Sequence, residues 1–275
     1  MCKNRKPFFS IVTISFNQEK FINECINSVL NQSFEDFEYI IQDPGSNDKS
    51  REIISLYKND PRLRICFEKD CSPSDGLNKG FSKANGHYFL FINSDDELCD
   101  NGLQNIYDEI TKNPGFDVYS GSARIIDKKG KFLRLTFSDK MNIRRAIHGQ
   151  CILVQPSTVF KSSLFNTIGG FNKNNLVNWD GELFIDFAIS SAKFKVFKKA
   201  ISNFRITSES ITGSGKFKRK IYIEQKKIYK KVYKKKPSKF FNLFTLIYRF
   251  ERKVLNIEDT FQRIIGGKIS GRSFD

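Results

Sequence analysis

The apolar run Phe9-Ser10-Ile11-Val12-Thr13-Ile14 decides the fold, because it is rich in β-branched residues and leads directly into the polar segment Ser15-Phe16-Asn17. Such a continuous run is typical of a parallel strand that is buried on both faces. Apolar residues then recur at helical spacing through residues 18–32, and a second strand is expected at 37–41. This order predicts a βαβ unit.

The same alternation continues as far as Asp96. Two further strands are expected at residues 63–67 and 88–92, with helices around residues 53–57 and 77–84 before them. Strands that alternate with helices form parallel sheets through right-handed crossovers. The sequence therefore predicts an α/β fold with a doubly wound, nucleotide-binding type of sheet.

After Asp96 the pattern becomes mixed. Helices are expected at 103–112 and 179–192, with short strands between 117 and 137. We predict one large domain at residues 1–215, with a first half at about 8–96 and a second half at about 97–215. A basic helical extension is predicted at residues 216–275.

The charge of the chain is concentrated in that extension. The 275 residues carry a formal net charge of +16, and the residues before 216 contribute only +3 whereas the residues from 216 onward contribute +13. With 39% hydrophobic residues, the chain is neither disordered nor collagen-like. A strong positive charge indicates an anionic partner.

Two patterns indicate where the protein works. The six cysteines form no CxxC pair and have no neighbouring histidine, so we expect free thiols in a reducing cytosol rather than a zinc site. The apolar run 240–250 is about half the ~20 residues of a membrane-spanning helix, so no transmembrane segment is expected.

The basic extension contains an amphipathic helix at 216–236, in which lysines surround an apolar face. This pattern, followed by the apolar run, favours an interfacial helix on anionic lipid and a peripheral location on the inner face of the cell membrane. The alternatives are a helix that packs its apolar face on the catalytic domain and a nucleic-acid-binding surface.

Polar clusters follow three of the predicted strands, where open α/β sheets bind their ligands. Asp95 and Asp96 come directly after the fourth strand. Adjacent carboxylates repel, so a divalent cation such as Mg²⁺ or Mn²⁺ explains them, and a solvated turn is the alternative. Asp43 ends the second strand, and Asp75 and Lys79 open a helix at which an anion could bind.

Four segments in series resemble family 2 glycosyltransferases with the GT-A fold, closest to the bacterial enzymes that assemble surface polysaccharides. These segments are residues 10–17, 38–48 (Glu-Tyr-Ile-Ile-Gln-Asp-Pro-Gly-Ser-Asn-Asp), 75–80 (Asp-Gly-Leu-Asn-Lys-Gly) and 91–96 (Phe-Ile-Asn-Ser-Asp-Asp). The resemblance covers roughly residues 8–212 and implies that residues 1–215 form a GT-A glycosyltransferase domain, with a nucleotide half at about 8–96 and an acceptor half at about 97–215. One departure is Pro44, which lacks an N–H at a position where the family more often has a small or acidic residue.

The resemblance implies a role for each matching residue. Ser15, Asn17 and Asp43 would hold the nucleotide base and ribose, and Asp75 and Lys79 would line the donor site. Asp95 would face the donor sugar or ribose, and Asp96 would bind the divalent cation, Mg²⁺ or Mn²⁺. The catalytic base would be Asp180, after the segment Gly169-Gly170-Phe171, with Glu182 as the alternative. Arg205 would lie in a late loop that closes over the diphosphate or acceptor.

The resemblance implies a metal-dependent, inverting glycosyltransferase of the hexosyltransferase type. It would move a sugar from a nucleotide-diphosphate sugar to an acceptor hydroxyl, such as that of a lipid-linked saccharide. A nucleotidyltransferase is an alternative, but it usually needs a glycine-rich basic loop after the first strand, which residues 15–19 do not provide. A nucleic-acid-binding protein would leave Asp95, Asp96 and Asp180 without a role.

Overall fold

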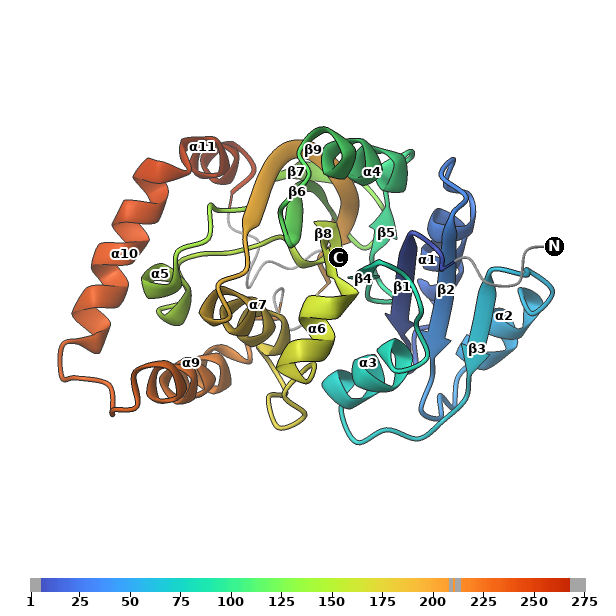
Figure 1. The fold of residues 1–275 in the computed structure, drawn as a ribbon, viewed down its shortest axis with the longest axis horizontal. Coiled ribbons are helices and arrows are strands. Elements are labelled where there is room, and N and C mark those ends of the chain that lie inside the picture. The colour runs from blue at the N-terminus through green and yellow to red at the C-terminus, as the bar shows by residue number, and fades with distance from the viewer. Residues whose placement is uncertain (1–5, 208–209, 211–213, 268–275) are drawn as a thin grey trace.

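The computed structural model describes residues 6–207, 210 and 214–267. Its first half contains four parallel strands in the order β3-β2-β1-β4, which confirms the predicted doubly wound arrangement (Figure 1). The elements of this half are β1 (Phe9–Ile14), α1 (Ile22–Leu30), β2 (Phe37–Gln42), α2 (Ser50–Leu56), β3 (Leu63–Cys66), α3 (Pro73–Phe81) and β4 (Tyr88–Phe91).

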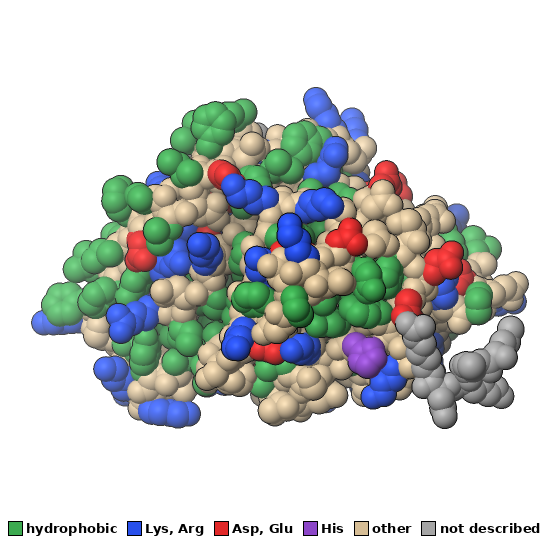
Figure 2. Space-filling model, turned by 45° about the horizontal axis from the view of Figure 1, so that its top comes forward, with side chains coloured by type: hydrophobic (Ala, Val, Ile, Leu, Met, Phe, Trp, Pro, Cys, Tyr) green, Lys and Arg blue, Asp and Glu red, His purple; other side chains and the backbone are tan. Residues whose placement is uncertain are grey.

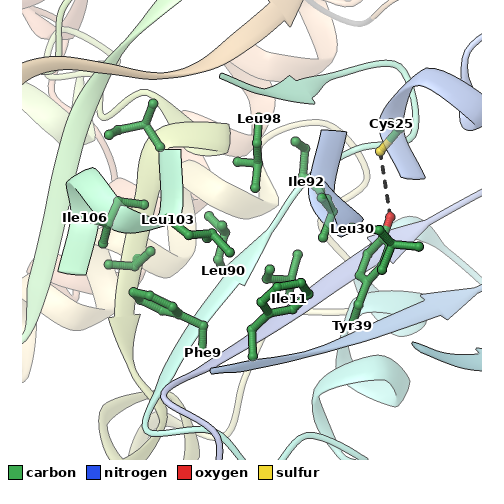
Figure 3. Close-up of a cluster of buried hydrophobic side chains, with 14 of the residues drawn as sticks. Phe9, Ile11, Cys25, Leu30, Tyr39, Leu90, Ile92, Leu98, Leu103 and Ile106 are labelled. Atoms are coloured by element: carbon green, nitrogen blue, oxygen red, sulfur yellow. Dashed lines mark hydrogen bonds between the residues drawn. The ribbon is translucent and has the colours of Figure 1, made fainter. Parts of the chain in front are cut away.

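Helices cover both faces of these strands. The apolar side of α1 packs on one face in a buried cluster that includes Phe9, Ile11 and Tyr39 (Figure 3). On the other face, α3 approaches β1 so closely that a Cβ atom at Gly80 would lie 2.5 Å from Val12 Cγ1. Glycine at position 80 thus permits close packing of the helix α3 on the strand β1.

The second half extends the same sheet with mixed strands, in the order β4-β8-β6-β9-β5, and β7 pairs with β6. The strand β9 was not predicted, because its lysine-rich sequence obscures the alternation of buried and exposed residues. The elements of this half are β5 (Glu97–Leu98), α4 (Gly102–Lys112), β6 (Val118–Ile126), β7 (Phe132–Thr136), α5 (Ile143–Ile147), the 3₁₀ turn η1 (Gln155–Ser157), β8 (Thr158–Lys161), α6 (Ser162–Ile168), α7 (Trp179–Ile189) and β9 (Phe194–Arg205).

The described chain continues, after a gap in the described residues, with the helices α9 (Lys218–Tyr233), α10 (Phe241–Leu255) and α11 (Ile257–Ile265). Figure 1 places them at the end of the molecule opposite β2 and β3. The apolar face of α9 packs on the catalytic domain through Ile228, which is buried against Ile147 and Ile185. This packing agrees with the alternative in which the helix packs its apolar face on the rest of the protein, although Ile223 of the same helix is 44% exposed.

Within the described part of the chain, none of the helices has the length and apolar content needed to cross a bilayer.

Candidate active site

A cavity of about 1380 Å³ opens at the carboxyl ends of β1 and β4. Ser15, Asp95 and Asp180 all line it, although 85 residues separate the last two in the sequence. The nucleotide half provides one wall, and the acceptor half together with α9 provides the other. The structure thus brings three of the predicted site residues to one cavity.

Ser15 continues β1 and is almost completely buried. Its backbone N–H donates to the Gln42 carbonyl at 2.9 Å, whereas its hydroxyl has no hydrogen-bond partner among the described residues. A buried hydroxyl without a partner is costly, so this oxygen is suited to receive a polar group of a ligand.

Asn17 is exposed and does not line the cavity. It adopts a left-handed backbone conformation with φ 54°, which asparagine tolerates. Its N–H donates to Ser46 Oγ at 2.9 Å, and its Oδ1 accepts from the Asn47 N–H at 3.0 Å. Asn17 therefore ties the loop after β1 to the loop after β2.

Asp43, which follows β2, is buried and fully engaged by its own turn. Its Oδ1 accepts hydrogen bonds from the Gly45 and Ser46 N–H groups and from Arg51 Nε, each at 2.9 Å. Its Oδ2 accepts from Ser46 Oγ at 2.6 Å. Burial alone would raise the pKa of this carboxyl, but the bonds from Ser46, Arg51 and Gly45 lower it below the ordinary value. Asp43 thus stays ionised and shapes the loop that carries Pro44 into the cavity wall.

Asp75 and Lys79 lie in α3, which directly follows the cavity-lining loop of residues 69–73. Asp75 Oδ1 lies 2.7 Å from Lys173 Nζ, and Oδ2 lies 3.4 Å from Lys79 Nζ. The hydrogen bond from Lys173 is the main reason why the pKa of Asp75 lies well below its usual range. Lys79 Nζ also donates to the Lys69 carbonyl. These two side chains stabilise the loop rather than line the cavity.

The adjacent residues Asp95 and Asp96 have different surroundings. Asp95 is partly exposed and lines the cavity, whereas Asp96 is completely buried and does not. Asp96 Oδ1 accepts a hydrogen bond from the Arg205 N–H at 2.9 Å. Burial raises the pKa of Asp95, and burial together with the charge of Asp95 raises the pKa of Asp96 well above its ordinary value. Asp95 is therefore the carboxylate of this pair that a ligand can reach.

Arg205, at the end of β9, is buried rather than part of a loop over the cavity. Its Nε donates to the Asp95 carbonyl at 2.9 Å, and its NH2 donates to Glu24 at 2.5 Å and to Glu97. The guanidinium also lies over the ring of Phe21, 4.8 Å from its centroid. Arg205 thus holds the loop of Asp95 in place, which sequence reasoning did not identify.

Asp180 and Glu182 lie in the first turn of α7 but differ in the same way as the Asp95 pair. Asp180 lines the cavity, and burial raises its pKa. Glu182 is buried and accepts hydrogen bonds from Asn172 Nδ2, Asn175 Nδ2 and Lys231 Nζ. The carboxylate oxygens of Glu182 are thus occupied by hydrogen bonds within the protein, and Glu182 does not line the cavity. This favours Asp180 as the residue that contacts a substrate.

Asp70 is a further carboxylate on the cavity wall, and it was not predicted because it lies in an irregular loop. Burial and the nearby Asp75 raise its pKa.

The described residues contain no group of three or more His, Cys, Asp or Glu side chains able to hold a metal ion by themselves. Mg²⁺ and Mn²⁺ at nucleotide sites are commonly held by only one or two carboxylates together with substrate phosphates. Of the adjacent pair Asp95 and Asp96, only Asp95 borders the cavity, and its one carboxylate fits a cation that is shared with a diphosphate.

Residues 10–176 match the family described as Glycosyl transferase family 2, which is more than half of the chain. The chain belongs to glycosyl transferase family 2. The predicted family resemblance is therefore confirmed, and family membership favours glycosyl transfer over nucleotidyl transfer.

Relatives within this family differ in how much of the chain they match. An uncharacterized glycosyltransferase of Haemophilus influenzae is 28% identical over 219 residues, which are 78% of this chain and 86% of that protein. The GalNAc(5)-diNAcBac-PP-undecaprenol beta-1,3-glucosyltransferase of Campylobacter jejuni is 29% identical over 137 residues, which are 49% of this chain and 43% of that protein.

Among solved structures, the mannosyltransferase PcManGT from Pyrobaculum calidifontis, in complex with GDP-Man and Mn²⁺, has a similar fold. Its TM-score is 0.64 at 14% identity, and the likeness covers 96% of this chain and 74% of that one. The likeness confirms the expected GT-A type of α/β fold.

Proposed function

We propose that this family 2 glycosyltransferase transfers a sugar from a nucleotide-diphosphate sugar to an acceptor hydroxyl, with inversion at the anomeric carbon. The observation that carries the proposal is that Asp95 and Asp180, from opposite halves of the domain, line one cavity. The solved relative PcManGT contains a nucleotide sugar, GDP-Man.

The donor occupies the wall formed by the nucleotide half. The Ser15 hydroxyl contacts the nucleotide directly, because it is otherwise without a partner. Asn17 and Asp43 hold the two loops that enclose the base and ribose. Asp75 and Lys79 support the donor site through the loop of residues 69–73.

The divalent cation, Mg²⁺ or Mn²⁺, is assigned to Asp95 rather than to Asp96. Asp96 is enclosed by protein and already accepts a hydrogen bond from Arg205, whereas Asp95 borders the cavity. When bound, such a cation stabilises the negative charge that develops on the diphosphate leaving group. Asp96 orients the loop, because its buried carboxylate accepts a hydrogen bond from the Arg205 N–H.

Asp180 acts as the general base. It removes the proton from the acceptor hydroxyl as the hydroxyl oxygen forms a bond to the anomeric carbon. The bond from that carbon to the diphosphate oxygen breaks on the opposite face, and the nucleoside diphosphate leaves with the electron pair. A carboxylate whose pKa is raised by burial accepts the proton more readily than an ordinary aspartate does.

The function is tested by incubating the protein with a panel of nucleotide sugars and Mn²⁺ and measuring release of the nucleoside diphosphate. We expect slow metal-dependent hydrolysis of one donor, since water can replace the acceptor. Release that is absent for every donor, with and without Mn²⁺, would contradict the proposal.

The acceptor is proposed to be a lipid-linked saccharide in surface polysaccharide assembly. The name of the Campylobacter relative specifies an undecaprenol-linked acceptor. An enzyme that acts on such a substrate benefits from attachment to the membrane surface. The cytoplasmic face is proposed because nucleotide sugars are expected there.

The surface for this attachment is the apolar face of α10 and α11, which we call the apolar ridge. Its large apolar side chains are exposed, up to 70% for Phe250 and 74% for Ile264. Figure 2 shows hydrophobic side chains gathered at this end of the molecule, with lysine and arginine among them. The ridge consists of Leu243, Phe244, Leu246, Ile247, Phe250, Val254, Leu255, Ile257, Phe261, Ile264 and Ile265.

Burying one large apolar side chain yields about 1.5–3 kcal/mol, so a few ridge residues suffice for reversible binding to a bilayer. The neighbouring cations Lys239, Arg249 and Lys253 favour anionic lipid. In flotation with vesicles that contain phosphatidylglycerol, the double variant Phe250→Ser/Ile264→Ser should stay at the bottom, while the wild type floats. Leu56→Ser, at an isolated exposed leucine far from the ridge, is the control. Equal flotation of the Phe250→Ser/Ile264→Ser variant and the Leu56→Ser variant would exclude the apolar ridge as the membrane-binding surface.

A further inference from the structure

The acceptor side of the cavity has a basic wall that the proposed mechanism does not use. Arg134 of β7 and Arg263 of α11 both line the cavity. The guanidinium of Arg134 belongs to a side chain that is only 4% exposed, whereas Arg263 is 42% exposed. The stem of Arg134 is clamped by the backbone at Gly266, where a Cβ atom would lie 2.8 Å from Arg134 Cβ.

The charge of Arg134 is poorly neutralised. Its NH1 donates to the Leu135 carbonyl at 2.8 Å, and its Nε has no hydrogen-bond partner among the described residues. The nearest carboxylate oxygen of Asp259 is 3.9 Å from NH1. A buried guanidinium without a close anion is unfavourable, and burial lowers the pKa of Arg134 to about 10.

Asp259 neutralises Arg134 only in part, because it pairs more closely with two other arginines. Oδ2 pairs with Arg263 Nε at 2.6 Å and with Arg252 NH2 at 2.9 Å. Oδ1 accepts hydrogen bonds from Thr136 Oγ1 at 2.9 Å and the Phe137 N–H at 3.2 Å. Arg252 is shared with Asp139, whose Oδ2 lies 2.6 Å from its Nε. Among the residues that the structure describes, this network thus joins three arginines to two carboxylates, and two of the arginines border the cavity.

The backbone of Arg134 lies two strands away from the strand that ends at Arg205. In the sheet, Ile125 of β6 is opposite Arg134 of β7 on one side and Phe204 of β9 on the other. Two strand spacings therefore separate the backbone of Arg134 from that of Phe204, which is on the order of 10 Å. Phe204 immediately precedes Arg205, the residue that holds the Asp95 loop. Because Arg134 and Asp95 line the same cavity, the test below includes a variant of Asp95 that distinguishes an anion at Arg134 from a diphosphate beside Asp95.

We propose that Arg134 and Arg263 bind a phosphate group carried by the acceptor, so that the enzyme recognises phosphorylated or diphosphate-linked saccharides. This inference rests on the proposed transfer reaction for its biological meaning, but the anion site itself does not depend on catalysis. Guanidinium groups bind phosphate oxygens through paired hydrogen bonds, and the Nε of Arg134 has no hydrogen-bond partner among the described residues.

The test measures binding of inorganic phosphate and pyrophosphate by calorimetry, with EDTA present so that no cation recruits them to Asp95. We expect Arg134→Gln and Arg263→Gln each to weaken binding about tenfold or more. The matched control is Arg145→Gln. Arg145 is also a buried arginine whose Nε lacks a hydrogen-bond partner among the described residues, but Arg145 does not line the cavity.

Unchanged binding in both Arg134→Gln and Arg263→Gln would overturn the proposal, as would a wild type that binds neither anion. Binding lost in Asp95→Asn but kept in the arginine variants would place the anion at the donor site instead. If Arg134→Gln fails to fold, anion binding is compared in Arg263→Gln and Arg134→Lys instead, and unchanged binding in both would overturn the proposal. Loss of vesicle flotation in Arg263→Gln would point to a lipid headgroup and overturn the acceptor assignment. Donor hydrolysis by the wild type tests the transfer reaction independently.

Discussion

Replacing Asp180 by asparagine should separate catalysis from folding. The change keeps the shape of the side chain but removes the base, so the rate of transfer should fall about 10²- to 10⁴-fold. This corresponds to roughly 3–5 kcal/mol of barrier height. Loss of one negative charge in the first turn of α7 costs at most about 1 kcal/mol of stability, so the melting temperature should drop by no more than roughly 4 °C.

The assay compares nucleoside diphosphate release with binding of the nucleotide sugar, and Glu182→Gln is the matched control two residues away. Glu182 accepts hydrogen bonds from Asn172, Asn175 and Lys231, so its replacement should cost about 3 kcal/mol of stability and leave transfer by the folded protein intact. The reasoning is refuted if Asp180→Asn remains active while folded Glu182→Gln is inactive.

Three further predictions follow from the surroundings of single residues. The rate should fall as the pH falls through the raised pKa of Asp180, because only the deprotonated carboxylate accepts a proton, so the acid limb of a pH–rate profile should lie above pH 3.8; a midpoint at or below that value would argue against this base. Asp95→Asn should abolish Mn²⁺-dependent protection of the protein by nucleotide sugars in thermal shift assays, whereas Asp96→Asn, at a side chain that does not border the cavity, should keep it; the reverse pattern would assign the cation to Asp96 instead. Arg205→Met should lower stability by about 1–3 kcal/mol in urea titrations, since it removes the ion pairs with Glu24 and Glu97 and the hydrogen bond to the Asp95 carbonyl, and a wild-type midpoint would disprove that role.

Much of the fold could be predicted because each strand of the nucleotide half is a continuous apolar run. The strand β1 was predicted with its observed bounds, since burial on both faces makes the run unambiguous. The strand β9 was not predicted, because exposed lysines interrupt it. The sequence does not show which amphipathic helix packs its apolar face on the protein. In the structure, α9 packs against α5 and α7 through Ile228, whereas the apolar side chains of α10 and α11 that form the apolar ridge are exposed.

The candidate site could be predicted as a set of residues but not as a set of orientations. Adjacent side chains at the end of a strand point in different directions, so Asp95 and Asp96 look alike in sequence while only one borders the cavity. Arg134 was not predicted, and Arg205 was expected in a loop over the cavity, because a buried arginine resembles an ordinary surface charge until its burial is known.

The contact between Arg205 and the Asp95 loop spans 110 residues of chain. A contact between such distant positions closes a long loop and is slow to form, so topology sets the order in which parts of the protein mature. The parallel strands of the first half can pair early through short crossovers, but the donor loop reaches its final geometry only after β9 has joined the sheet. During synthesis, a nascent chain that ends before Arg205 would therefore have a nearly complete nucleotide half and no competent donor site, which gives the enzyme an intrinsic delay between folding and activity.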